Sequence, residues 1–186
     1  MRALLDANVL YPATLRSLPI DLSVMGVYRA HWTDEIHDEW IRNLVFKRPD
    51  LDPVKLQRNR ELMDRALDTA RITGYEALIP QVRLPDPEDR HVVAAALQGG
   101  MELIVTQNLK DFPEGVLKPL GFTAIHPDRF VGEFLQAQPE EVLEALRRGR
   151  ARYRAPVLSA EEMLTRLERQ GLSTTSQTLR ASVAQF

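Results

Sequence analysis

Four acidic residues from separate segments of the chain are the best candidates for chemistry. They are Asp6, Glu39, Asp89 and Asp111. Asp6 follows the apolar run 2–5, and Asp111 follows the apolar run 102–106, so both would lie beyond the carboxyl ends of strands in a parallel sheet, where ligands bind. Carboxylates are the ligands that Mg²⁺ and Mn²⁺ prefer, and such sites leave positions open for phosphate oxygens. This cluster therefore indicates a metal site able to hydrolyse phosphodiesters.

Asp89 allows two interpretations. On an α-helical wheel it lies within about 60° of Val92, Val93 and Ala96, an apolar stripe on which a carboxylate is costly unless it is paired, hydrogen-bonded or bound to a metal. Alternatively, it is the third residue of a helix capped by Asp86, and it satisfies backbone donors as in a capping box. The helix by itself leaves both roles open.

Glu39 belongs to a predicted helix, 33–47, that begins at a capping Thr33 and carries several acids. Those acids are Asp34, Glu35, Asp38 and Glu39. Glu39 is the one nearest the apolar stripe, which it flanks by about 100°. The alternative for each acid is a position on a solvated helix face.

The elements that must position these residues alternate between strands and helices, which predicts a parallel α/β sheet. The predicted strands are 2–5, about 30–32, 102–106 and 122–125. The predicted helices are 21–30, 33–47, a long one from 52 to Gly74, and one from Asp86 to the glycine pair 99–100. The stretch 75–84 is expected to be irregular or a weak edge strand.

The character of the chain changes near Pro127, after which strand signals are absent. Three helices are predicted at 128–137, 139–152 and 160–170, the last with a capping box from Ser159 to Glu162. The final residues are ambiguous. We therefore expect two units, an α/β domain at 1–127 and an all-α extension at 128–186.

Five arginines crowd the end of the predicted helix 139–152. They are Arg147, Arg148, Arg150, Arg152 and Arg154. Some can favour the helix dipole. Because five exceed what the dipole needs, contact with an RNA backbone or a protein partner is the expected role of the rest.

The composition excludes several classes of function. The 186 residues contain no cysteine, which rules out disulfides, thiolate zinc sites and iron–sulfur clusters. Motifs for dinucleotides, P-loop phosphates, a serine nucleophile elbow and HExxH zinc sites are also missing. No apolar run is long enough for a membrane span, so a cytoplasmic location is expected. His91 is placed on another helix face from Asp89 and is left out of the site.

Four segments carry a resemblance to a known family. LLDANVLYP, WTDEIHDEWIRNL, LPDPEDRHVVAAAL and IVTQNLKDFP resemble, in order, the four acidic motifs of PIN-domain ribonucleases. The resemblance covers about residues 2–126. It implies a parallel sheet between helices and four acids that bind Mg²⁺ or Mn²⁺ for RNA cleavage. Many bacterial members are VapC-type toxins, and the helical tail resembles a C-terminal extension in one subgroup of them.

The resemblance also assigns residues and partners. It implies catalytic and metal-binding roles for Asp6, Glu39, Asp89 and Asp111. It implies supporting roles for Asn8, Asp86, Thr106 and Asn108, with Asp86 as a substitute for or accessory to Asp89. The division of labour between Asn108 and Asp111 stays open. The implied partners are an RNA substrate and a cognate antitoxin, and a homodimer is allowed.

Other functions compete with this hypothesis. A haloacid-dehalogenase-like phosphatase also begins with a strand ending in Asp, but it needs a second Asp two residues later, where this chain has Asn8. Within the PIN fold, the alternatives are a non-toxin RNA-processing nuclease and a degenerate RNA-binding protein. Retention of all four acids argues against degeneration.

Overall fold

A four-stranded parallel sheet organises the molecule, and the computed structural model describes all 186 residues. The strands are β1 (Arg2–Leu5), β2 (Arg29–His31), β3 (Leu103–Val105) and β4 (Thr123–Ile125), in the spatial order β2-β1-β3-β4. In the register of the central pair, Leu5 lies beside Val105. Because all strands are parallel, the residues that follow β1 and β3 emerge at the same edge of the sheet. The predicted α/β fold is confirmed.

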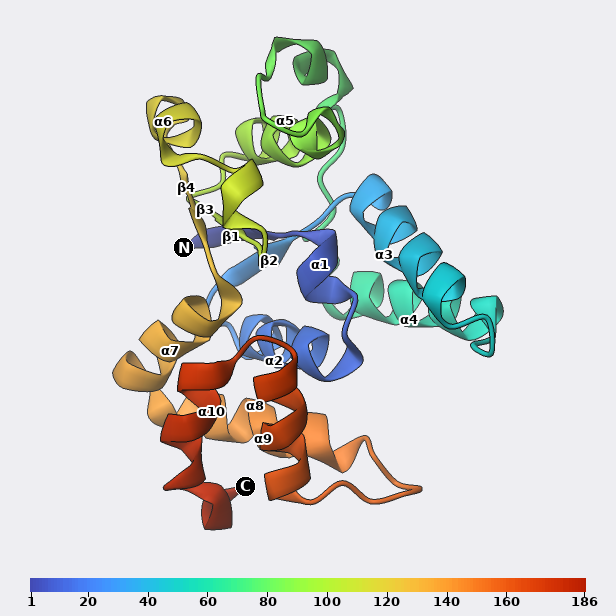
Figure 1. Cartoon of the computed structure of the whole chain (residues 1–186), viewed down its shortest axis with the longest axis vertical. Helices are drawn as coiled ribbons and strands as arrows, with labels where there is room; N and C mark the ends of the chain where they lie inside the picture. The colour runs from blue at the N-terminus through green and yellow to red at the C-terminus, as the bar shows by residue number, and fades with distance from the viewer.

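Helices cover both faces of this sheet, with α5 on one side and α2 on the other (Figure 1). The α-helices of the first part are α1 (Ala7–Leu10), α2 (Ala13–Val24), α3 (Asp34–Lys47), α4 (Pro53–Ala66), α5 (Arg90–Gly99) and α6 (Glu114–Leu117). Short 3₁₀ helices are η1 (Glu76–Gln81), η2 (Pro87–Asp89), η3 (Leu109–Asp111) and η4 (Lys118–Leu120). No helix combines the length and the apolar character needed to span a membrane.

Some predicted helix limits are right and others are wrong. The hydroxyl of Thr33 accepts a hydrogen bond from the backbone of Ile36 at 3.1 Å, which confirms it as the cap of α3. The helix predicted at 21–30 instead runs over Ala13–Val24 and stops before Gly26, whose φ of +80° turns the chain. The long helix predicted up to Gly74 ends at Ala66.

The early end of α4 has a tertiary cause. The chain beyond it pairs with the residue after β2: the Trp32 N–H donates to the Ala70 carbonyl at 3.1 Å, and the Ile72 N–H donates to the Trp32 carbonyl at 2.9 Å. These two bonds extend the sheet edge locally and replace further helix. The stretch after Gly74, considered above as an edge strand, forms the 3₁₀ helix η1.

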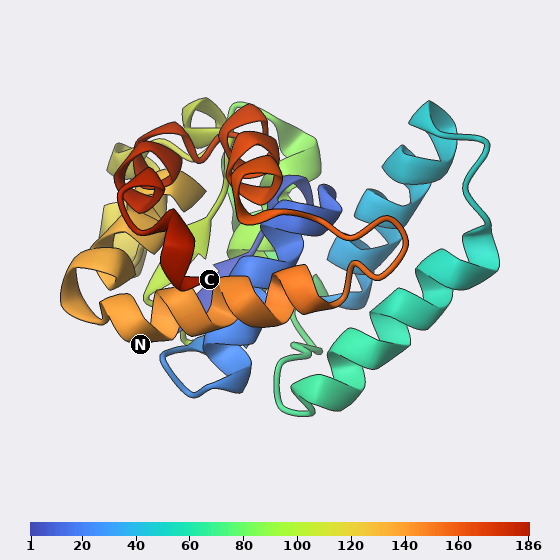
Figure 2. The same ribbon diagram turned by 90° about the horizontal axis from the view of Figure 1, so that it is seen from below.

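The C-terminal segment is entirely helical. It consists of α7 (Pro127–Ala137), α8 (Pro139–Ala151), α9 (Ala160–Arg169), α10 (Ser173–Arg180) and the 3₁₀ helix η5 (Val183–Gln185). The capping box from Ser159 to Glu162 is present, and the ambiguous final residues form α10 and η5. Figures 1 and 2 show these helices gathered against α2, on the side away from α5.

The extension shares one hydrophobic core with the α/β part. Buried leucines of α8 and α9, such as Leu146 and Leu167, belong to the same cluster as Leu18 and Leu22 of α2. Gly149 permits the close approach of α8, since a Cβ at that position would lie 3.0 Å from Met163 Cε and 3.3 Å from Ser17 Oγ. The helices beyond Pro127 are therefore packed against the domain over a continuous apolar surface.

The arginine cluster of α8 is largely engaged within the protein. Arg152 donates two hydrogen bonds to Asp21 on α2, one of them 2.7 Å long, and Asp21 is only 2% exposed. Arg147 and Arg148 both pair with Glu144 on their own helix. These three arginines thus have partners within the protein. Contact with RNA or a protein partner stays a prediction for all five arginines of the cluster.

We expect Arg152 to stabilise the fold. Arg152→Ala leaves the buried Asp21 carboxylate without its cation, a change that costs several kcal/mol for a fully buried pair; because Arg152 is partly exposed, we expect a loss of about 1–2 kcal/mol. Arg154→Ala removes an exposed arginine from the same segment and should change stability by less than about 0.5 kcal/mol. Urea unfolding measures both. Equal losses in the two variants would contradict the structural role.

Candidate active site

Asp6 is the most buried acid of the site. It follows β1, caps α1 and is 3% exposed. Its Oδ1 accepts a hydrogen bond from the Ala7 N–H at 2.7 Å, and its Oδ2 accepts one from the Thr106 hydroxyl at 2.7 Å. Burial raises the pKa of Asp6 to about 6, because the hydrogen bond from Thr106 offsets only part of the desolvation and nearby Glu39 adds to the rise. Asp6 is thus held in one orientation at the sheet edge.

Asn8 and Thr106 join the ends of β1 and β3 around Asp6. The Asn8 amide group donates to both Asp6 Oδ2 and Thr106 Oγ1, and its Oδ1 accepts the Gln107 N–H at 2.9 Å. The Asn108 N–H donates to Thr106 Oγ1 at 3.0 Å. Three of the four residues expected to support the site, Asn8, Thr106 and Asn108, therefore form one hydrogen-bonded network with Asp6.

A tight group of three carboxylates lies close by. Asp86, Asp89 and Asp111 each offer an oxygen, and these oxygens lie within 4.8 Å of one another. Asp111 is oriented by a hydrogen bond from the Asn108 amide. The group is formed by the 3₁₀ turn η2 and the loop after β3, so segments more than twenty residues apart supply it. Three carboxylate oxygens at this separation are a donor set that fits a divalent cation.

The structure separates the roles of Asp86 and Asp89. Asp86 caps the turn by accepting the Glu88 N–H at 2.9 Å, whereas the Asp89 side chain makes no capping hydrogen bond. The capping interpretation of Asp89 is therefore wrong. Its pKa is raised to about 7, first by burial and then by the charges of Asp6, Asp86, Asp111 and Glu39. The charges of four neighbouring acids thus disfavour the ionised form of Asp89.

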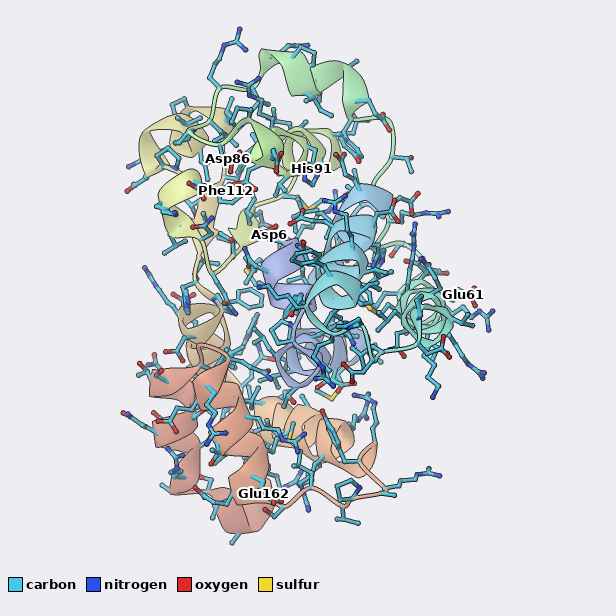
Figure 3. The ribbon with its side chains drawn as sticks, turned by 45° about the vertical axis from the view of Figure 1, so that its right-hand side comes forward. Asp6, Glu61, Asp86, His91, Phe112 and Glu162 are labelled. Carbon is cyan, nitrogen blue, oxygen red and sulfur yellow. The ribbon has the colours of Figure 1, made fainter.

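The acids gather at one end of the sheet. Figure 3 shows Asp6, Asp86 and His91 there, while Glu61 and Glu162 lie away from them on the outer faces of other helices. Asp6 and Glu39 are outside the three-carboxylate group but close enough to raise the pKa of Asp89. All four acids predicted from the sequence are brought together, and Asp86 joins them.

Comparisons with known proteins agree with this geometry. The PIN domain model matches residues 2–110, more than half of the chain. The chain belongs to the PIN domain family. A second model, the VapC50 C-terminal domain, matches residues 127–181.

This PIN protein is similar to a curated relative from Mycobacterium tuberculosis that is named "Putative ribonuclease VapC50". The two are 45% identical over 74 residues, which are 40% of this chain and 43% of the relative. The matched part thus spans less than half of that relative. No solved structure matches the chain.

His91 is a residue of this PIN site that sequence analysis missed. It is 6% exposed, with Nε2 3.7 Å from Glu39 Oε2 and Nδ1 3.6 Å from Glu35 Oε2. Burial lowers the pKa of His91, but the hydrogen bond and charge of Glu39 and the charge of Glu35 outweigh it, so the net shift is upward. The imidazole lies between Glu35 and Glu39, and in its protonated form it would counter part of their negative charge.

The error has a geometric cause. The helical wheel placed His91 away from Asp89 by assuming one α-helix through both residues, whereas Pro87–Asp89 is a 3₁₀ turn and α5 begins at Arg90. The apolar run at residues 92–97 could have indicated that His91 belongs to the site. Because that helix must be buried on nearly all sides, a histidine within its first turn needs a polar partner.

We expect Asp6 and Asp89 to destabilise the metal-free protein as the pH rises. They have folded-state pKa values of about 6 and 7, above the unfolded value of about 3.9, so in the folded state these two groups bind more protons between these limits. Their contribution to the unfolding free energy should therefore fall between pH 4 and pH 7, by a few kcal/mol at most. Thermal melts in EDTA across this range measure it.

The variant Asp89→Asn isolates this contribution. His31 and His37, whose pKa values are lowered by burial, and carboxylates with a lowered pKa such as Asp128 act in the opposite direction, but they are the same in both proteins. The variant should be more stable than the parent at pH 8 in EDTA, and the difference should shrink toward pH 5. Excess Mg²⁺ should raise the melting temperature of the parent more than that of the variant. A variant less stable than the parent at pH 8 would contradict the account.

Proposed function

We propose that this protein is a metal-dependent endoribonuclease and the toxin of a bacterial toxin–antitoxin pair. Residues 1–127 form the nuclease unit, and residues 128–186 form a helical extension. The observation that carries the proposal is the convergence of five acids, including the buried Asp6, at the sheet edge of a PIN domain. The named relative and the match of the extension support the toxin class.

The spacing of the carboxylates supports a choice of metal ligands. Asp86, Asp89 and Asp111 would hold Mg²⁺ or Mn²⁺, and Asp6 and Glu39, also expected as ligands from the sequence, would complete the acidic lining. When bound, the cation supplies an activated water and stabilises charge on the scissile phosphate. Without it, five acids repel an RNA phosphate, so productive substrate binding depends on the cation.

The other residues of the site fix these acids in place. Thr106 and Asn8 hold Asp6 Oδ2, and Asn108 holds Asp111, so two of the acids keep one orientation before substrate arrives. His91 lies against Glu39 and keeps its carboxylate near the sheet end. The chain therefore offers a preorganised acidic site instead of mobile side chains.

The observed contacts disfavour two of the three alternative functions. In a dehalogenase-like phosphatase the residue at position 8 must exchange a proton, but the Asn8 amide is an obligatory donor to Asp6 and Thr106. A degenerate RNA-binding PIN protein does not need acids that raise one another's pKa. A non-toxin RNA-processing nuclease fits the same site, and only the partner distinguishes it.

RNA cleavage should depend on the metal and on Asp89. Loss of an outer-shell partner typically costs about 10–100-fold, so Asp89→Asn, which removes a ligand, should reduce cleavage at least about 100-fold. The control Glu61→Gln changes an exposed acid of α4 and should cleave like the parent. Products should carry 5′-phosphate and 3′-hydroxyl ends. Cleavage in excess EDTA, or 2′,3′-cyclic phosphate ends, would refute the metal mechanism.

Expression in a bacterial host tests the toxin class. The wild type should arrest growth and generate new RNA ends, whereas Asp6→Asn should do neither. A small protein encoded beside this gene, with a DNA-binding domain and a flexible tail, should restore growth when it is co-expressed. Normal growth with specific maturation of one RNA would favour the processing nuclease instead.

A further inference from the structure

A groove of about 1030 Å³ opens beside the acidic site. It shares Asn8 and Glu39 with the site. One wall is formed by α3 and α4, and the other by the turn between α9 and α10 in the C-terminal extension. Figure 2 shows α9 and the α3–α4 pair on opposite sides of α1. The nuclease unit and the extension thus build this groove together.

The groove carries mainly positive side chains, whereas the neighbouring acidic site carries negative ones. Its lining contains four basic residues and a single acid, Glu39. The basic residues are Arg16, Lys47, Arg48 and Arg169. Arg48 pairs with Asp50, but Lys47 and Arg169 are exposed and make no ion pair. These two cations are available to an anionic ligand.

Two aromatic residues, Trp40 and Tyr11, contact basic side chains of the groove. Arg16 is buried over the Trp40 ring, 4.5 Å from its centroid, and donates to the Leu10 carbonyl at 2.8 Å. Burial lowers the pKa of Arg16 to about 10, so the side chain remains charged at neutral pH. The partly exposed ring of Tyr11 lies 5.4 Å from the Lys47 ammonium and presents a surface for stacking.

The backbone that carries Arg169 is anchored to the nuclease unit. The Gln170 Oε1 accepts the Leu15 N–H at 2.8 Å, and the Gln170 carbonyl accepts the Gln107 side-chain amide at 2.9 Å. Gly171 turns the chain with a φ of +102°, a conformation that favours glycine. Arg169 is therefore held beside the groove by contacts that lead back to Asn8 through Gln107.

We propose that this groove binds the phosphate backbone of a single-stranded RNA segment on its way to the acidic site, with Arg169 of the extension and Lys47 of α3 as its two phosphate contacts. The inference rests on the proposed nuclease function. The groove volume is comparable to the largest small-ligand pockets, which suits a short unpaired segment. A basic groove with an aromatic stacking surface is the usual design for single strands.

The test measures RNA binding and its dependence on salt. The Asp89→Asn protein serves as the parent, so that the RNA stays intact. The probe is a labelled single-stranded RNA of mixed sequence and about ten nucleotides, within the site sizes of single-strand-binding folds. Arg169→Ala and Lys47→Ala are compared with Arg65→Ala, which removes an exposed arginine of α4 outside the groove.

Each phosphate contact contributes about 0.7 to the slope of log K against log salt for a single strand. We expect Arg169→Ala and Lys47→Ala each to reduce the slope by about 0.7 and to weaken binding about fivefold at 0.1 M salt. Arg169→Lys should keep the slope, because it keeps the charge. Arg65→Ala should bind like the parent.

Several outcomes overturn the inference. Unchanged slopes in Arg169→Ala and Lys47→Ala, with cleavage by the wild type intact, overturn the groove assignment alone. Tighter binding of a duplex of the same sequence overturns the single-strand assignment. If the parent binds no RNA and the wild type cleaves none, the groove assignment and the proposed function fail together.

Discussion

The burial of one carboxylate, Asp6, is the constraint on which the rest of the structure depends. A buried charge is costly unless hydrogen bonds replace the water it has lost. Its donors come from Ala7, Asn8 and Thr106, and Thr106 is adjacent only because β1 and β3 run parallel with Leu5 beside Val105. The register of the central strands therefore determines whether the site exists at all. A slip of one residue would leave Asp6 without the Thr106 hydroxyl.

Acidic and basic side chains lie in separate regions around Asp6. Five acids and one histidine occupy the end of the sheet, and unpaired cations lie one step away, where α3 faces the extension. The near-neutral net charge of −2 conceals this polarity, since the overall composition averages two opposed fields. On the proposed path, a polyanion would meet these cations first and would reach the acids only with a counterion.

Local signals made the sheet and several caps predictable, and the PIN domain match confirms the fold. Thr33 and Ser159 act on backbone groups three residues away, so their roles can be recognised from short motifs. The end of α4 could not be predicted, because Ala70 and Ile72 pair with Trp32 across the fold. The placement of His91 and the acids depended on a 3₁₀ turn that a helical wheel misrepresents. The division into two units, 1–127 and 128–186, stays a prediction. Because both parts contribute to one hydrophobic core, a change in composition along the chain does not by itself define two domains.

Gln107 connects the acidic site to the C-terminal extension. Its backbone N–H is bonded to Asn8 and its side chain to the Gln170 carbonyl, so one residue belongs both to the acidic site and to the docking surface of the extension. If a ligand of the acidic site changes the strength of the contact between Gln107 and Gln170, reciprocity requires that a change at this contact alters the affinity for that ligand by the same factor. A single glutamine thus links the two parts of the chain through two hydrogen bonds.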